Sequence, residues 1–351
     1  MIHNTVVEKF KQLPFLIPPN TMYTDETRLL NRYFNGLVVD RSGTIKDTNF
    51  PNVVIESFIP TSITNPGDFS QISDKEAANI LKQSIETNLP IAVMYSGGLD
   101  STNVVCAFLK QNIKITVIGS QASIDENPTF YNNVLVNNSN VTLIIGNPLR
   151  FAKEHLNEYL LVTGECGANI MGPIFYAFKS YSSDMTEQQW NDCAKVLSTP
   201  DLLSNVADEQ MKKKFLLVLD RSPKTFKTNY DAQWWVRYCL IWQFTANRMQ
   251  MYFGEYHSTL INFFKSKNFE NWALYNDSDV KCPNFNRDYY KMPMRDYIYN
   301  FCHDKKASYD MPKRPSIERT YPQLNYNGRY VLDNPRIVGS VTLDSHSNLN
   351  Y

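Results

Sequence analysis

The sequence lacks an apolar run that could cross a membrane. None of its hydrophobic stretches approaches the roughly 20 residues of a spanning helix, and the chain does not open on a signal-peptide pattern. It also lacks net charge, because 35 basic residues balance 35 acidic ones. A broad basic face for nucleic acid is therefore not indicated. We expect a cytoplasmic protein without a membrane partner, for which a nucleic-acid substrate is possible but not favoured.

Metal-binding and disulfide patterns are missing as well. The six cysteines include no C-x-x-C pair, and the five histidines show no metal-ligand spacing. We expect reduced, mostly buried thiols and no zinc site. The chain has no Gly-Lys-Ser/Thr ending of the kinase-type phosphate loop.

One stretch combines a buried strand, a glycine turn and a helix. It is Ile91-Ala-Val-Met-Tyr-Ser-Gly-Gly-Leu-Asp-Ser101, followed by apolar residues with helical spacing from Val104 to Leu109. Two adjacent glycines let a ligand approach the backbone closely. Unpaired N–H groups at the start of the helix, with serine hydroxyls beside them, suit a polyphosphate. The alternative is an ordinary serine-glycine turn between a strand and a helix.

Strand and helix patterns alternate after this loop. Strands are predicted at 113–119 and 141–146, and helices at 127–137 and 149–161. This alternation predicts an α/β fold with a parallel sheet flanked by helices and connected by right-handed crossovers. Ligands on such sheets bind beyond the carboxyl ends of the strands, where the glycine turn falls.

The chain on either side of this α/β region differs in character. Residues 1–72 read as a small β-rich N-terminal segment with strands at 36–43 and 52–58, and a helix follows at 73–87. From about residue 170 the chain turns helical, with one long helix at 231–256 and others at 258–266 and 291–301. The last part, 331–351, reads as an irregular tail. The aromatic stripe of the long helix could stack on a base, but packing in the core is the commoner use.

The segment Ser96-Gly-Gly-Leu-Asp-Ser101 resembles the pyrophosphate loop of the ATP pyrophosphatase superfamily. Members of that superfamily cleave ATP to AMP and pyrophosphate while they adenylate an oxygen of a second substrate. The resemblance implies a fold of the adenine nucleotide alpha hydrolase-like (HUP) type.

A second segment, Leu161-Val-Thr-Gly-Glu-Cys-Gly-Ala-Asn-Ile-Met-Gly172, is similar to the Ser-Gly-Glu-Gly-x-Asp-Glu segment of asparagine synthetases and β-lactam synthetases. Lys291-Met-Pro-Met-Arg resembles a K-x-x-L-R helix near the end of that synthetase domain. Lys313-Arg314 stands in the place of its late lysine-containing turn, and either residue could correspond to the family lysine. The resemblance places a synthetase-like domain at 73–330, helical from about 170.

The resemblance implies a role for each matched position. The pyrophosphate would be held by the residues of the loop, Ser96, Gly97, Gly98, Leu99 and Ser101. Asp100 would bind Mg²⁺, a hard cation that prefers oxygen ligands. The adenosine would be bordered by Tyr95, Ile118 and Gly164.

Three further residues would act on the reacting groups. Glu165 would face the activated carboxyl and the incoming amine, and Lys291 and Lys313 would neutralise charge on the polyphosphate or the acyl-adenylate. The alternatives are a helix-start carboxylate for Glu165, a solvated helix lysine for Lys291 and a surface basic turn for Lys313.

Two departures from the family pattern stand out. Ala168-Asn169 replaces the Asp-Glu pair, of which the aspartate would be a second magnesium ligand. Residue 2 is Ile2 and not the cysteine nucleophile of the glutamine-hydrolysing half, and the lead-in is too short to hold that half. If the chain makes an amide, the nitrogen is expected from ammonia or from an amine-bearing substrate.

Three functions are compatible with these patterns. The first is an ATP-dependent, AMP-forming ligase that adenylates a carboxylate and passes it to ammonia or an amine. The second is an enzyme of the same superfamily that modifies a nucleobase or tRNA. The third is a nucleotide-binding partner protein that has lost the chemistry.

Overall fold

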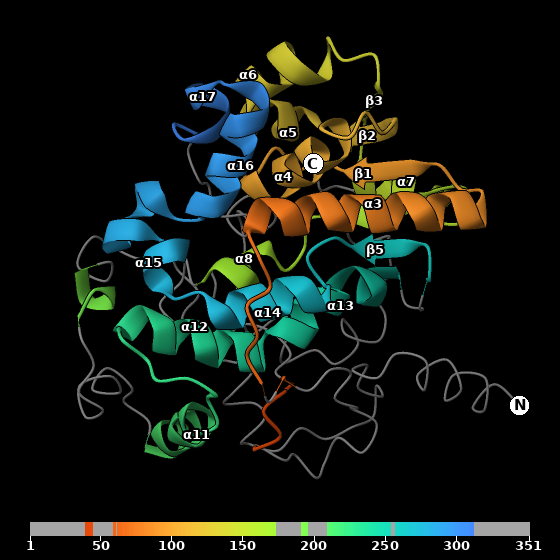
Figure 1. The fold of residues 1–351 in the computed structure, drawn as a ribbon. Coiled ribbons are helices and arrows are strands. Elements are labelled where there is room, and N and C mark those ends of the chain that lie inside the picture. Colours follow the sequence, from red (N-terminus) through yellow and green to blue (C-terminus); the bar gives the residue numbers. More distant parts are fainter. Residues whose placement is uncertain are drawn as a thin grey trace, which may run out of the picture.

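The computed structural model describes residues 39–44, 59–60, 62–172, 191–195, 209–253 and 257–311. Within these residues the chain forms a five-stranded, all-parallel sheet with helices on both faces (Figure 1). The predicted α/β class and parallel sheet are confirmed. The strands are β1 (Ile91–Met94), β2 (Ile115–Gly119), β3 (Val141–Ile145), β4 (Leu160–Thr163) and β5 (Leu260–Asn262).

The helices before and within the sheet region are α3 (Phe69–Thr87), α4 (Leu99–Leu109), α5 (Gln121–Glu126), α6 (Pro128–Phe130), α7 (Pro148–Glu154) and α8 (Gly167–Met171). Those of the second half are α11 (Glu209–Asp220), α12 (Asn229–Leu240), α13 (Trp242–Phe253), α14 (Lys267–Tyr275), α15 (Ser278–Lys281), α16 (Met292–Cys302) and α17 (Lys305–Ser308). A π-helical turn, η1 (Tyr131–Leu135), follows α6, and two 3₁₀ turns, η2 (Pro283–Phe285) and η3 (Arg287–Tyr289), precede α16. None of the described helices is long and apolar enough to cross a membrane.

The strand order β3-β2-β1-β4-β5 places the two predicted motifs side by side. The chain moves outward from β1 to β2 and β3, and β4 then pairs with the other edge of β1. At such a reversal of strand order, open parallel sheets bind ligands beyond the carboxyl ends of the two flanking strands, which here are β1 and β4. The glycine loop follows β1 and the Glu165 segment follows β4.

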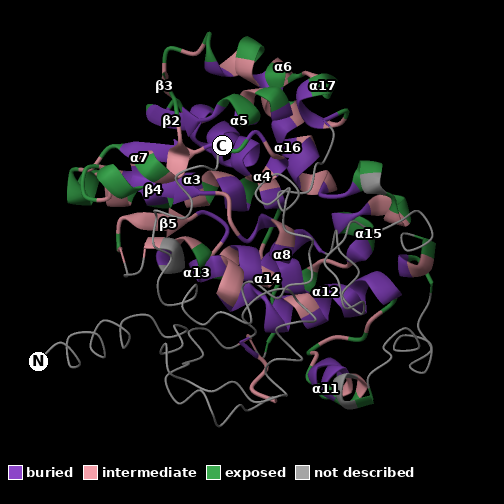
Figure 2. Cartoon of the chain, turned by 180° about the vertical axis from the view of Figure 1, so that it is seen from behind, coloured by how far each residue is buried: buried purple, intermediate pink, exposed green. Residues whose placement is uncertain are grey.

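Both faces of the central strands β1, β2 and β4 are buried, which explains their continuous apolar sequences. Side chains alternate between faces along a strand. Ile91 and Val93 therefore join the main core with α3, α4 and α16, while Ala92 packs with Ile118 and with Ala152 of α7 on the opposite face. The burial pattern in Figure 2 follows these layers, with buried residues along the sheet and the inner sides of the helices.

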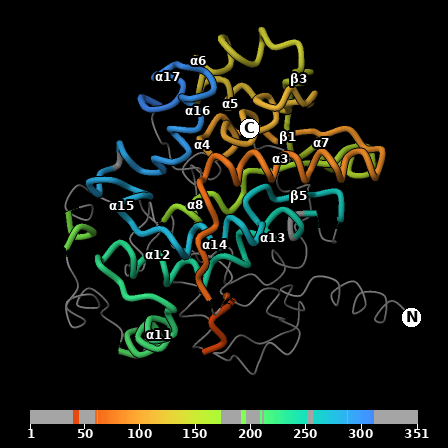
Figure 3. The backbone as a smooth tube through the Cα atoms, in the orientation of Figure 1, coloured from red at the N-terminus to blue at the C-terminus, as the bar shows by residue number. Residues whose placement is uncertain are grey.

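The helical half adjoins the sheet beyond β5. Helices α12, α13 and α14 gather on that side, whereas α16 and α17 lie beside α4 and α6 (Figure 3). Trp235, Cys239 and Trp242 are buried, as the packing interpretation of the aromatic stripe predicted.

The prediction of one helix over 231–256 is wrong, because the helix breaks at Ile241, which has φ −113°. In a continuous helix the carbonyls of Cys239 and Leu240 would accept bonds from the next turn. Here they accept from the backbone N–H groups of Arg41 and Val39, each at 3.1 Å. The chain therefore starts a second helix, α13, at a new angle. Residues 254–256 lie outside the described residues.

Two other helix predictions need correction. The helix predicted at 149–161 ends at Glu154, and its last residues begin β4. The segment 258–266 contains β5 and not a helix. Short buried apolar runs do not reveal their period, so only their pairing partners decide between strand and helix. Pairing in the structure aligns Leu161 with Leu260.

Residues 39–44, where a strand was predicted at 36–43, contain a turn and no strand, and α3 already begins at Phe69, within the predicted N-terminal segment. The Asp40 carboxylate closes the turn by accepting hydrogen bonds from the backbone of Ser42 and Thr44, both at 2.9 Å. The predicted strand at 52–58 and the predicted tail at 331–351 lie outside the described residues. All six cysteines are free and five are buried, as predicted.

Candidate functional site

The loop after β1 contains one glycine that the fold requires and one that it does not. Gly97 has φ +78°, and a Cβ there would lie 2.2 Å from the Ser123 carbonyl oxygen. No L side chain fits that position. Gly98 has an ordinary extended backbone, and the nearest atom to a Cβ there is Ser96 Oγ, at 3.4 Å. The space beside Gly98 is therefore available to a ligand.

Donors collect at the start of α4. Its first intrahelical hydrogen bond runs from Thr102 N to Gly98 O (3.0 Å), so the N–H groups of Leu99, Asp100 and Ser101 precede the hydrogen-bond ladder of the helix. Ser101 Oγ accepts from Ser96 N and donates to Gly98 O, both at 3.1 Å. The hydroxyls brace the loop while the helix dipole makes its mouth favourable for an anion.

The second motif packs directly on the first. β4 ends at Thr163, and a Cβ on Gly164 would lie 2.9 Å from Ser101 N. A Cβ on Gly167 would lie 2.0 Å from Asp100 Oδ1. Both glycines are therefore needed for the close approach of two segments that lie more than sixty residues apart in the sequence.

Lys291 and Asp100 form an ion pair at the centre of this contact. Lys291 Nζ lies 2.5 Å from Asp100 Oδ2 and also bonds Oδ1. The lysine is fully buried and has φ +61° where α16 begins, and the aspartate side chain is 22% exposed. A solvated helix lysine, the alternative for Lys291, does not describe this residue. The structure thus brings together the glycine loop, the second motif and the segment that begins at Lys291.

The described residues do not form a resident magnesium site. They contain no group of three or more His, Cys, Asp or Glu side chains that could hold a metal ion. Both oxygens of the Asp100 carboxylate are bonded to Lys291. Asn169, in place of a family acidic residue, donates to Thr245 Oγ1 at 3.5 Å. These residues fit an ion carried by the phosphates of a nucleotide better than one held by protein ligands alone.

Glu165 faces a cation that the sequence reasoning missed. Arg248 Nη2, on α13, lies 2.6 Å from Glu165 Oε1 and 2.8 Å from Oε2. The Glu165 side chain is 18% exposed and that of Arg248 is 51% exposed. One signal was present in the sequence, because Arg248 is the only charged residue between Trp242 and Phe253. Its partner is evident only from the fold, in which α13 packs against β5.

The side chains predicted to border the adenosine lie in the core. Tyr95 N donates to Ile118 O at 2.8 Å, which aligns the ends of β1 and β2. The Tyr95 ring is buried and stacks on Phe130 at 6.3 Å, and burial raises the pKa of its hydroxyl. Ile118 is fully buried on the α7 face. A nucleotide would therefore meet the backbone at these strand ends. Lys313 lies outside the described residues.

Cys166 follows Glu165 with φ +67° and is buried, and this burial raises the pKa of its thiol. Asn262, the last residue of β5, donates through Nδ2 to its sulfur at 3.6 Å. β5 pairs Asn262 with Thr163, so the amide lies at the same carboxyl edge as the motif. Asn262 was missed because its segment was predicted to be helical.

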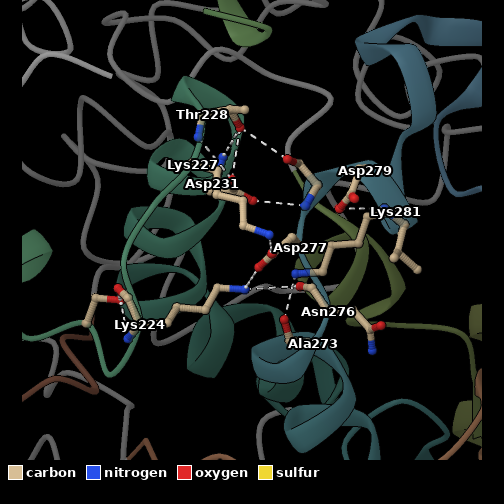
Figure 4. Close-up of polar contacts among 12 residues, drawn as sticks. Lys224, Lys227, Thr228, Asp231, Ala273, Asn276, Asp277, Asp279 and Lys281 are labelled. Atoms are coloured by element: carbon tan, nitrogen blue, oxygen red, sulfur yellow. Dashed lines mark hydrogen bonds and ion pairs between the residues drawn. The ribbon is translucent and has the colours of Figure 1, made fainter. Parts of the chain in front are cut away.

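A buried aromatic residue supports the second motif from behind. Trp234 Nε1 donates to Asn169 O at 2.9 Å. Lys281 Nζ lies 3.4 Å from the centroid of the Trp234 ring. The same nitrogen donates to Ala273 O (Figure 4). Lys224 joins the same cluster through Asp277, at 2.6 Å. This cluster fixes α8 against α12 and α15 and has no part of the glycine loop in it.

Sequence comparisons assign no family. No protein-family model matches the chain, and no curated protein matches it.

Proposed function

We propose that the protein is an ATP-dependent, AMP-forming ligase. It adenylates a carboxylate or a carbonyl-type oxygen and transfers the activated group to ammonia or an amine. The observation that carries this proposal is the contact of Gly164 and Gly167 with Ser101 and Asp100. This contact joins the two motifs of the synthetase resemblance beyond the carboxyl ends of the neighbouring strands β1 and β4. An ordinary serine-glycine turn would have no reason to recruit the second motif.

The division of labour follows from the charges. The N–H groups at the start of α4 and the hydroxyl of Ser96 hold the β- and γ-phosphates. A substrate carboxylate oxygen then attacks the α-phosphorus, a new P–O bond forms and pyrophosphate leaves. Two anions meet in this step, and the Lys291 ammonium, fixed beside the loop, lowers their repulsion. Asp100 would be the residue that holds a Mg²⁺ ion brought by ATP, and that ion would supply further positive charge for the phosphates.

The second step involves Glu165. The amine attacks the acyl carbon, a C–N bond forms and AMP leaves, while the proton lost by the nitrogen passes to the Glu165 carboxylate. Arg248 Nη2 bonds both oxygens of that carboxylate. The acceptor must therefore compete with Arg248 for Glu165, or bring an anionic group that Arg248 binds instead.

A second candidate function is a nucleotide-binding partner protein without chemistry. Ala168-Asn169 stands in place of the acidic pair, and the carboxylates of Asp100 and Glu165 are both ion-paired. Such a protein would bind ATP and release no pyrophosphate.

Product analysis distinguishes these candidates. The protein is incubated with ATP, Mg²⁺, ammonium and a pool of carboxylates and amino acids, and nucleotides are identified by ³¹P NMR. The ligase releases AMP and pyrophosphate only when an acceptor is present, and Asp100→Ala abolishes this release. Asp125→Ala, on the exposed side of α5, serves as the control. ADP and orthophosphate as products would contradict the proposal, and ATP binding without turnover would favour the partner protein.

A further inference from the structure

An arginine from the N-terminal segment is buried inside the helical half. Arg41 is fully buried, and its backbone and that of Val39 bond to the last carbonyls of α12. The Asp40 turn that follows directs the chain out of the core again. The chain thus inserts one charged side chain between helices more than 190 residues away.

The Arg41 guanidinium contacts three elements at once. Its central carbon lies 5.0 Å from the centroid of the Tyr238 ring on α12 and 4.8 Å from that of the Trp242 ring on α13. Its Nη2 bonds the carboxylate of Glu270 on α14, which also accepts from the Tyr238 hydroxyl at 3.0 Å. A planar cation that stacks on rings and bonds an anion at its edge suits this position better than an ammonium does.

One of these helices carries Arg248, and another packs against the helix that follows Glu165. Trp242 is the first residue of α13, which presents Arg248. α14 packs against α8, the helix that begins two residues after Glu165. Burial raises the pKa of the Cys166 thiol, and the charges that act on this thiol include those of Arg41 and Glu270. Arg41 therefore contacts the helix that presents Arg248 and the helix that packs against α8.

We propose that Arg41 is a positioning residue of the candidate site. By stacking on Trp242 and bonding Glu270, it fixes α13 relative to α14 and thereby sets the distance between Arg248 and Glu165. The expected change in the KM for the acceptor rests on the proposed function. The expected change in the reactivity of Cys166 does not, so the two expectations can fail separately.

The first test is Arg41→Lys, which keeps the positive charge for Glu270 and removes the planar face. The wild type and the variant are treated with N-ethylmaleimide, and each cysteine is followed by peptide mass spectrometry. We expect labelling of Cys166 to rise at least tenfold while that of Cys106, buried in α4, changes less than twofold. In the pyrophosphate-release assay, the KM of Arg41→Lys for the acceptor should rise at least tenfold, and its KM for ATP should rise less than twofold.

The control is Tyr297→Phe, which removes a hydrogen bond of 2.5 Å to Asp74 between α16 and α3. It measures what a general loss of stability does, and we expect no selective rise at Cys166. If Arg41→Lys does not fold, the double variant Arg41→Met/Glu270→Gln removes both charges together, and the same labelling decides.

The results separate the two proposals. Equal labelling of Cys106 and Cys166, or no change at either, overturns the positioning role. A wild type without pyrophosphate release but with selective Cys166 labelling in Arg41→Lys overturns the ligase proposal alone. If Arg41→Lys keeps the acceptor KM of the wild type, only the charge of residue 41 matters, and this result also overturns the role given to stacking.

Discussion

The substitution Gly98→Ala separates a phosphate-binding loop from a structural turn. Gly98 precedes α4 with φ −75° and ψ 164°, values that alanine adopts without strain. The new Cβ would lie 3.4 Å from Ser96 Oγ and within 4 Å of no other atom outside the neighbouring residues. Loss of the N-cap preference costs about 1 kcal/mol, and reduced freedom of the unfolded chain returns about 0.4–1 kcal/mol. The free energy of unfolding should therefore change by less than about 1 kcal/mol.

Ligand binding should respond very differently to the same substitution. A methyl group at the mouth of the loop keeps a phosphate oxygen from reaching the N–H groups at the start of α4. A hydrogen bond to a charged group contributes about 1.5–3 kcal/mol. Losing one such bond raises the Kd for ATP or pyrophosphate roughly 10- to 150-fold.

The assay pairs thermal unfolding with calorimetric titration of ATP and of pyrophosphate. Gly146→Ala is the matched control, because that glycine ends a strand at the same edge of the sheet and a Cβ there meets no atom within 4 Å. We expect both variants to melt close to the wild type and only Gly98→Ala to lose affinity. If Gly98→Ala binds ATP as tightly as the wild type, the loop does not grip phosphate and the reasoning fails.

Three other predictions concern charged or buried ionisable side chains. Asp100→Ala should destabilise the fold more than Lys291→Met does, about 3 against 1–2 kcal/mol, because it removes the carboxylate partner of a fully buried cation, whereas the Asp100 side chain is 22% exposed; equal losses in urea unfolding would contradict this burial argument. Arg248→Gln should change stability by less than about 1 kcal/mol, since the arginine is half exposed, yet change acceptor-dependent pyrophosphate release at least tenfold, upward if the acceptor competes with Arg248 for Glu165 and downward if Arg248 binds an anionic group of the acceptor; unchanged release would remove Arg248 from the site. Burial lowers the pKa of Lys281 well below 10.5, so the unfolded state binds more protons and stability rises with pH up to about 10.5. Lys281→Met should be more stable than the wild type at neutral pH and should lack the rise of stability with pH. A less stable variant would show that the Lys281 amine is protonated in the folded protein.

The strand, loop and helix around Ser96–Ser101 could be predicted from the sequence because their signals are local. An apolar strand, two glycines and a helical stripe are contiguous, and the structure places them as β1, the turn and α4. The alternation that followed predicted β2 and β3 for the same reason. The sequence located the second motif and the Lys291 segment along the chain. It did not predict how these segments contact the loop.

The sequence by itself determined the α/β class, the glycine turn between β1 and α4, and the buried aromatic stripe, because each depends on neighbours within one or two turns of chain. Only the tertiary structure decided that Leu160–Thr163 and Leu260–Asn262 are strands, that α12 ends at Leu240, and that Lys291 bonds Asp100. It also decided that Arg248 faces Glu165 and that Arg41 lies between α12, α13 and α14. These features join residues that are distant in the chain, and ion pairs and strand pairing acquire their energy only when folding brings both partners out of water together.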